Sequence, residues 1–212
     1  VSFMSNENTF TFDNFKTAVQ EPYRTGFINS IKIGLFSAAI AAFPGALAAY
    51  FIETRGSSKL RRTIAVMSGV LANTGGVPLA FMFYAALGIQ GYLTKFLKSL
   101  GWDLYSGTFS LGSFIGLLIV YLYFQLPLMV IVFSPAIVSL RREWSEAARN
   151  LGASQFNYWL RIGFPLLFPS FIASFLLLFA SGFSAYATAN ALTVGNLPLT
   201  PLQIGGLLDG NV

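Results

Sequence analysis

The segment 141–165 carries the most informative side chains of the sequence, because their spacing predicts short amphipathic helices with charged groups beside an apolar stripe. Apolar side chains recur there at i, i+3, i+4 and i+7, which places them in one stripe along a short helix. Glu146 and Arg149 lie away from the stripe, three residues apart, where they can pair. The stripe consists of Trp144, Ala147, Ala148 and Leu151.

Three further residues of this segment predict how it is divided. Gly152 stands where a left-handed residue would end the first helix. A second short helix can begin at Ser154, and Pro165 is expected to break the segment before the next long helix. Two short amphipathic helices at an angle would form a rigid projection. The alternative is an amphipathic loop that lies on a membrane surface.

The composition excludes most forms of catalysis. Cys and His are both absent, which removes disulfides, Cys/His zinc sites and His-dependent nucleophilic catalysis. The sequence contains no GxxxxGK[ST] motif for nucleotide binding. We therefore expect no catalytic residue, no metal and no cofactor. The net charge of +5 is too dilute for a nucleic-acid surface.

The elements that must position the 141–165 segment are membrane helices. Of the 212 residues 55% are hydrophobic and only 10% are charged, whereas soluble domains carry about 25% charged residues. Long charge-free runs predict four spanning helices in an all-α integral membrane bundle that forms one domain over residues 1–212. The predicted spans are 28–52, 64–92, 111–138 and 166–190, with outer segments at 1–27 and 191–212 and a cytoplasmic loop at 139–165.

Basic residues set the expected orientation, because Lys and Arg concentrate on the cytoplasmic side. The links after the first and third spans would then be cytoplasmic, and Arg141 and Arg142 are expected to anchor lipid headgroups. The first residue is Val1, and we expect a trimmed chain whose parent has one more helix at each end, six in all. The basic residues of the two links are Arg55, Lys59, Arg61, Arg62, Arg141, Arg142, Arg149 and Arg161.

Small residues predict close helix packing. They recur every four residues in the first span and again at the third, and such rows let helix backbones approach each other in lipid. The rows consist of Gly34, Ala38, Ala42 and Ala46, of Ala41, Gly45 and Ala49, and of Gly112 and Gly116.

Polar residues within the spans are the candidates for a translocation path, because lipid rejects them. Intrahelical hydrogen bonds are the alternative for each Ser and Thr, and for Asn73 and Gln125 a cavity and an inter-helix polar contact are both open. The stretch 75–78 could break the second helix, and Pro127 and Pro135 could kink the third. No span holds a carboxylate, which argues against a secondary carrier. The candidates are Asn73, Thr74, Tyr121, Gln125, Ser181, Ser184, Tyr186 and Asn190.

The 141–165 segment resembles the EAA loop of ATP-binding-cassette (ABC) importer permeases. That pattern is Glu-Ala-Ala, a Gly four residues after the last Ala, and a terminal Ile-x-Leu-Pro. The chain departs from it only at Phe164, which replaces the Leu. The matching positions are Glu146, Ala147, Ala148, Gly152, Ile162 and Pro165.

The resemblance implies a coupling role for Glu146, Ala147, Ala148, Arg149 and Gly152, whose loop would sit in a groove of a cytoplasmic ATPase subunit. The implied partners are two such ATPases, a second permease that is identical or homologous, an extracytoplasmic solute-binding protein and membrane lipid, with no nucleic acid. The implied place is the bacterial cytoplasmic (inner) membrane, which the chain crosses several times. A membrane scaffold that does not transport is the rival interpretation.

A finer resemblance is to permeases of the spermidine/putrescine type. It depends on the stretches FTFDNF (10–15), GVPLAF (76–81) and EAARNLGAS (146–154). It implies a polyamine as the solute, although a polycation would benefit from acidic path residues that this chain lacks. Iron(III), thiamine, sulfate and phosphonate are the alternative solutes.

Overall fold

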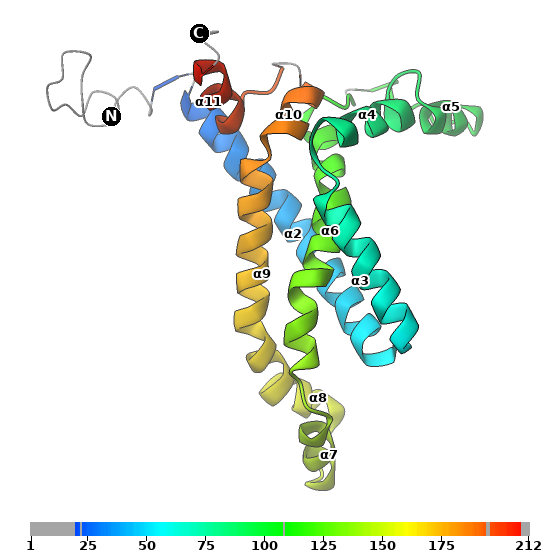
Figure 1. Ribbon diagram of the computed structural model, residues 1–212, viewed down its shortest axis with the longest axis vertical. Coiled ribbons are helices and arrows are strands. Elements are labelled where there is room, and N and C mark those ends of the chain that lie inside the picture. Colours follow the sequence, from blue (N-terminus) through cyan, green and yellow to red (C-terminus); the bar gives the residue numbers. More distant parts are fainter. Residues whose placement is uncertain (1–19, 22, 108, 194–195, 209–212) are drawn as a thin grey trace, which may run out of the picture. The chain divides into compact units, whose positions relative to one another are not determined.

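A computed structural model describes residues 20–21, 23–107, 109–193 and 196–208 (Figure 1). These residues form helices and turns with no strand. The predicted outer segment 1–27 lies mostly outside the described residues, as does its stretch 10–15. Four helices are long and apolar enough to cross a membrane, which confirms the predicted all-α membrane class. They are Tyr23–Arg55, Gly76–Ser99, Phe114–Val138 and Gln155–Ser184.

The helices belong to two compact units. The first unit takes residues from Val1–Leu35, Gly76–Leu118 and Phe183–Val212, and the second from Phe36–Gly75 and Ile119–Gly182. In chain order the elements are α2 (Tyr23–Arg55), α3 (Ser58–Asn73), α4 (Gly76–Leu87), α5 (Tyr92–Ser99), α6 (Phe114–Val138), α7 (Arg142–Asn150), α8 (Gln155–Tyr158), the π-helical turn η1 (Trp159–Gly163), α9 (Phe164–Ser184), α10 (Tyr186–Thr193) and α11 (Thr200–Leu208).

The predicted span 64–92 is not one helix. Helix α3 ends at Asn73 and α4 begins at Gly76, so the break expected at 75–78 is present. Gly76 has φ +76°, a left-handed conformation that a continuous α-helix cannot contain. The backbone N–H of Gly76 instead donates to the Thr188 hydroxyl at 2.8 Å. The candidate span here is Gly76–Ser99, which comprises α4 and α5.

The predicted span 166–190 extends beyond the C-terminal end of the helix that the structure contains. Helix α9 stops at Ser184, and α10 is a separate helix that packs beside α4 in the first unit (Figure 1). The Tyr84 hydroxyl of α4 donates to the Leu192 carbonyl of α10 at 3.0 Å. Hydrogen bonds to α4 therefore accompany the break between α9 and α10, and hydropathy alone does not reveal them.

The predicted outer segment 191–212 contains helix α11. It is attached to the start of α2, because the Thr200 N–H donates to the Ser30 hydroxyl at 2.9 Å and the Asn29 amide donates to the Pro198 carbonyl at 3.2 Å. Phe27 also meets Phe183 edge to face, with ring centroids 6.0 Å apart. These contacts join both ends of the described chain within the first unit.

Small residues allow close packing in the second unit, as predicted. A Cβ added to Gly45 would lie 2.6 Å from the Met129 Cβ, so α2 and α6 approach closely there. In the first unit, a Cβ on Gly112 would lie 2.9 Å from the Leu192 carbonyl oxygen. The buried core of the second unit consists of Ala38, Ala41, Ala42 and Ala49 from α2, Met129, Val130, Phe133 and Ile137 from α6, and Leu178 from α9.

Candidate functional site

Helix α7 has a defined beginning and end. Glu143 lies in its first turn and Arg149 in its last, and each charge favours the helix dipole at that end. Gly152 follows with φ +81°, which confirms the predicted left-handed stop. The Ala153 N–H donates to the Ala148 carbonyl and the Gly152 N–H to the Arg149 carbonyl, both at 2.9 Å. This pair of bonds is the Schellman motif, which fixes the direction in which the chain leaves the helix.

Helix α8 begins after Ser154, as predicted. The Ser154 hydroxyl accepts the backbone N–H of Asn157 at 3.2 Å and so caps the helix. The chain turns between α7 and α8 over only a few residues, and both ends of that turn are hydrogen-bonded. The two helices contact each other within the second unit (Figure 1).

Pro165 does not end the segment, which corrects the sequence prediction. Helix α8, η1 and α9 form one continuous helical stretch, Gln155–Ser184. A proline within a helix has no N–H to donate and so removes one backbone hydrogen bond, yet the helix continues past Pro165. The π-helical turn η1 precedes it, and the Phe164 N–H donates to the Trp159 carbonyl five residues back. Pro165 is thus the second residue of α9 and is compatible with its helical geometry.

The Glu-Ala-Ala triplet on α7 is partly exposed. Glu146, Ala147 and Arg149 are exposed, whereas Ala148 is buried and only 8% exposed. Over the residues that the structure describes, no ion pair joins Glu146 to Arg149. Exposed pairs of this kind contribute little to stability, so both charges can be presented to a partner.

The apolar stripe of α7 faces an open hollow of about 770 Å³. The hollow is almost entirely apolar, with Arg161 as its one charged residue. Its walls come from α7, the turn, η1 and the start of α9. They are formed by Trp144, Ala147, Ala148, Leu151, Ala153, Arg161, Ile162, Pro165 and Leu166.

Large apolar side chains of this segment are exposed. Trp144 and Leu151, which belong to the predicted stripe, line the hollow, whereas Phe156 of α8 and Leu160 of η1 lie outside its lining and were not predicted as site residues. Leu151 is 88% exposed and Phe156 is 73% exposed. Leu160 and Trp144 are also exposed. Contiguous exposed apolar surface marks an interaction site. The helical stripe was visible in the sequence, but periodicity cannot tell whether a stripe faces the protein's own core or a partner.

The candidate path residues are divided between the two units. Asn73, Thr74, Tyr121, Gln125 and Ser181 belong to the second unit, and Ser184, Tyr186 and Asn190 to the first. The Asn73 amide donates to the Gly69 carbonyl at 2.8 Å and the Thr74 hydroxyl to the Val70 carbonyl at 2.7 Å. Both are local bonds to a carbonyl four residues back. This is the alternative named for Thr74, whereas Asn73 was expected to make a contact outside its own helix.

Gln125 makes the inter-helix polar contact, which is one of the two roles left open for it. Its side chain is fully buried, and Nε2 donates to the Leu178 carbonyl of α9 at 3.1 Å. Its Oε1 atom is buried and has no hydrogen-bond partner among the described residues. Tyr121, one turn earlier on α6, is also buried and packs against Phe124 with ring centroids 5.3 Å apart.

Replacing Gln125 with leucine is expected to leave the stability of the protein almost unchanged. The substitution loses one hydrogen bond, but it also removes the buried, unpaired Oε1, whose desolvation cost is of similar size and opposite sign. We expect a change within about 1 kcal/mol, measured as the melting temperature in detergent. A loss of several degrees would mean that Oε1 has a partner that holds α6 and α9 together.

Comparison with known proteins identifies a family that the sequence matches. Residues 41–208 match the family model described as "Binding-protein-dependent transport system inner membrane component". The chain is 26% identical over 182 residues to the probable sulfate transport system permease protein cysT of Prototheca wickerhamii, covering 84% of this chain and 67% of the relative. It is 29% identical over 178 residues to the glucose import system permease protein GlcU of Saccharolobus solfataricus, covering 84% and 58%.

Two further similarities agree with that family. The chain is 28% identical over 168 residues to the spermidine/putrescine transport system permease protein PotB of Escherichia coli, covering 79% of this chain and 60% of the relative. The chain thus spans about three fifths to two thirds of the length of these relatives. In fold it is similar to a chain in the crystal structure of a bacterial ABC transporter involved in the import of the acidic polysaccharide alginate. The TM-score is 0.72 at 18% identity, over 99% of this chain and 76% of that chain.

Proposed function

The chain belongs to the family of binding-protein-dependent transport system inner membrane components, a family of multi-pass ABC transporter permeases, and from this we propose its role. We propose that it is a permease subunit of an ABC importer in the bacterial cytoplasmic membrane. Two such subunits, identical or homologous, would enclose the translocation path. Two cytoplasmic ATPase subunits would hydrolyse ATP, and an extracytoplasmic protein would deliver the solute.

The observation that carries this proposal is the surface of α7 and α8. A Schellman turn at Gly152 and a cap at Ser154 fix the two short helices, and Glu146, Leu151 and Phe156 stand exposed on them. An exposed carboxylate beside exposed apolar side chains suits a groove with a basic or amide group at its edge. We propose that this surface docks on the ATPase, with Glu146, Ala147, Ala148, Arg149 and Gly152 as coupling residues.

Two observations bear on the identity of the solute: the names of the similar relatives and the side chains within the predicted spans. The similar relatives are named for sulfate, glucose and spermidine/putrescine at 26–29% identity, so similarity does not favour one of them. The predicted spans contain no carboxylate that could bind a cation by ion pairing. We propose that the binding protein selects the solute and that polyamine is the first candidate to test. We propose that the translocation path is lined by Asn73, Thr74, Tyr121, Gln125, Ser181, Ser184 and Tyr186.

The proposal is tested by reconstituting the full-length protein in proteoliposomes with its co-purifying subunits. We expect uptake of one solute class that requires ATP on the cytoplasmic side. The solutes offered are spermidine, sulfate and glucose, each with the binding protein. Capture of an ATPase without ATP-dependent uptake of any solute would contradict the importer proposal, and failure to capture an ATPase from folded protein would favour the scaffold interpretation.

Replacing Gly152 with valine is expected to weaken ATPase capture. A β-branched residue at φ +81° is strained, because the left-handed conformation costs about 1–2 kcal/mol even for an unbranched residue. A Cβ at Gly152 meets no atom within 4 Å, so the conformation and not a clash would cause the loss. The measurement is the amount of ATPase that co-purifies with the full-length variant.

The control for this prediction is Gly152→Asn, because asparagine tolerates the left-handed region. It should retain most of the ATPase capture that Gly152→Val loses. Equal losses in both variants would mean that the partner contacts the glycine itself and that the turn geometry is not the cause.

A further inference from the structure

The side chain of Trp159 sits at the joint between α8 and α9 and fills a space that a glycine leaves open. It is the first residue of η1, and a Cβ added to Gly163 would lie 2.5 Å from its Cε3 atom. The indole therefore rests on the bare backbone of the last residue of η1. On another side the ring meets the Tyr50 ring of α2 edge to face, with centroids 5.2 Å apart at an interplanar angle of 81°.

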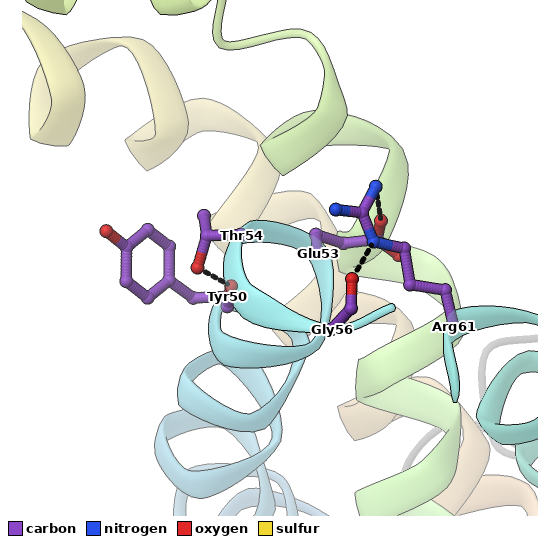
Figure 2. Close-up of polar contacts among 5 residues, drawn as sticks. All are labelled: Tyr50, Glu53, Thr54, Gly56 and Arg61. Carbon is purple, nitrogen blue, oxygen red and sulfur yellow. Dashed lines mark hydrogen bonds and ion pairs between the residues drawn. The ribbon is translucent and has the colours of Figure 1, made fainter. Parts of the chain in front are cut away.

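Tyr50 belongs to the last turns of α2. A hydrogen bond and an ion pair from Arg61 connect this end of α2 to the start of α3. The Arg61 Nε donates to the Gly56 carbonyl at 3.1 Å, and its guanidinium lies 3.9 Å from the Glu53 carboxylate (Figure 2). The Thr54 hydroxyl donates to the Tyr50 carbonyl at 2.6 Å (Figure 2). Tyr50 also packs against the buried core that α2 shares with α6.

The α7–α8 loop comprises α7, α8 and the turn between them, and the chain connects it to α6 and, through η1, to α9. The Tyr50–Trp159 contact adds a non-covalent contact between η1 and α2. An edge-to-face aromatic pair is favourable beyond the area it buries. Protein interiors are close-packed and transmit displacement instead of absorbing it. A movement of α8 and η1 would therefore press on α2 through these rings, and the Arg61 bonds would carry it to α3.

We propose that Trp159 and Tyr50 are positioning residues that transmit movement of the docked α7–α8 loop to α2 and α3. The inference rests on the proposed importer function and extends it, because it names the contact through which ATPase movement reaches the helices. Loss of the contact should leave ATPase docking intact and separate ATP hydrolysis from uptake.

The first test compares variants of the full-length protein in the reconstituted complex. In Tyr50→Leu we expect wild-type capture of the ATPase and wild-type ATP hydrolysis, but an uptake per ATP that is lower by about fivefold or more. The Tyr50 hydroxyl has no hydrogen bond recorded among the described residues, so the conservative variant Tyr50→Phe keeps the ring contact and should keep uptake per ATP. Normal uptake per ATP in Tyr50→Leu would overturn the proposal.

Gly163→Ala is a second variant, which should fold even if Tyr50→Leu is misfolded. Alanine favours helical structure over glycine, but its Cβ would displace the indole from Gly163. We expect the same loss of uptake per ATP with ATPase capture retained. Unchanged uptake per ATP in this variant would also count against the proposal.

A chemical rescue separates transmission from general damage. Residues 1–212 contain no cysteine, so the double variant Tyr50→Cys/Trp159→Cys, made in a full-length protein without other cysteines, offers two defined thiols. It should be uncoupled as made, and a short bifunctional thiol reagent that rejoins the two positions should restore uptake per ATP. A cross-linked protein that stays uncoupled would contradict the proposal.

The controls distinguish this inference from the function on which it rests. If wild type shows no ATP-dependent uptake of any solute, the importer function fails and the inference with it. If wild type transports and Glu146→Arg loses the ATPase while Tyr50→Leu transports normally, the importer function stands and only the inference is wrong.

Discussion

Replacing Glu146 with arginine is expected to abolish ATP-dependent uptake while the protein still inserts into the membrane. Glu146 is exposed on α7, so the change removes no contact from the core of the second unit. At the proposed interface it would replace a carboxylate with a cation opposite a basic or amide group. Truncating one partner of a paired charge at an interface costs about 2–5 kcal/mol, and charge reversal adds repulsion. ATPase affinity should fall by roughly 30-fold or more.

The measurement is co-purification of the ATPase with full-length protein in detergent, followed by uptake in proteoliposomes. Glu143→Arg is the matched control, because Glu143 makes the same charge change on the same helix but lies outside the EAA pattern. It should lose only the small dipole term of the first turn, about 0.3–1 kcal/mol. Equal losses in both variants would show that overall loop charge, and not Glu146 itself, governs docking.

The α7–α8 loop could be predicted in detail because its signals are local. The stop at Gly152 depends on a backbone conformation that glycine adopts readily, and the start after Ser154 depends on a hydroxyl that caps the next turn. Both features are encoded within a few residues. The expected break at Pro165 was wrong, because the helix passes from a π-helical turn through the proline without ending there. The sequence gives no sign of the π-helical turn that precedes it.

The limits of the membrane helices could be predicted only in part. Charge-free runs located all four apolar regions, because a bilayer core requires about 20 apolar residues. They could not place the breaks, which depend on contacts across the fold. Gly76 bonds to Thr188, and Tyr84 bonds to Leu192, more than one hundred residues away in each case. Only the glycines and proline at 75–78 indicated one of these breaks in advance.

Polar residues within the spans illustrate a different limit. Hydropathy identifies Asn73 and Gln125 as unusual in an apolar run but gives no partner for either. In the structure Asn73 bonds within α3, and Gln125 bonds across to α9. The same residue type can thus stabilise one helix or join two. A path role for either residue has to be tested by transport.

Replacing Gly45 with leucine is expected to prevent stable packing of α2 on α6. Its Cβ alone would lie 2.6 Å from the Met129 Cβ and 3.3 Å from the Leu126 carbonyl oxygen. Neither atom is the far end of a flexible side chain, so relief requires the helix backbones to separate. Overpacking of this kind costs about 1–3 kcal/mol or more. We expect a lower melting temperature or aggregation of the full-length protein in detergent.

Gly69→Leu is the matched control, because a Cβ on Gly69 in α3 would meet no atom within 4 Å. It should melt as wild type does. A second comparison uses the pair Gly45→Ala and Met129→Gly, since the latter removes the Cβ and Cγ that Gly45→Ala would strike. Residues in contact show coupling of about 0.5–3 kcal/mol, so the double variant should be less destabilised than the sum of the single variants. Strict additivity would mean that α2 and α6 do not approach each other at Gly45.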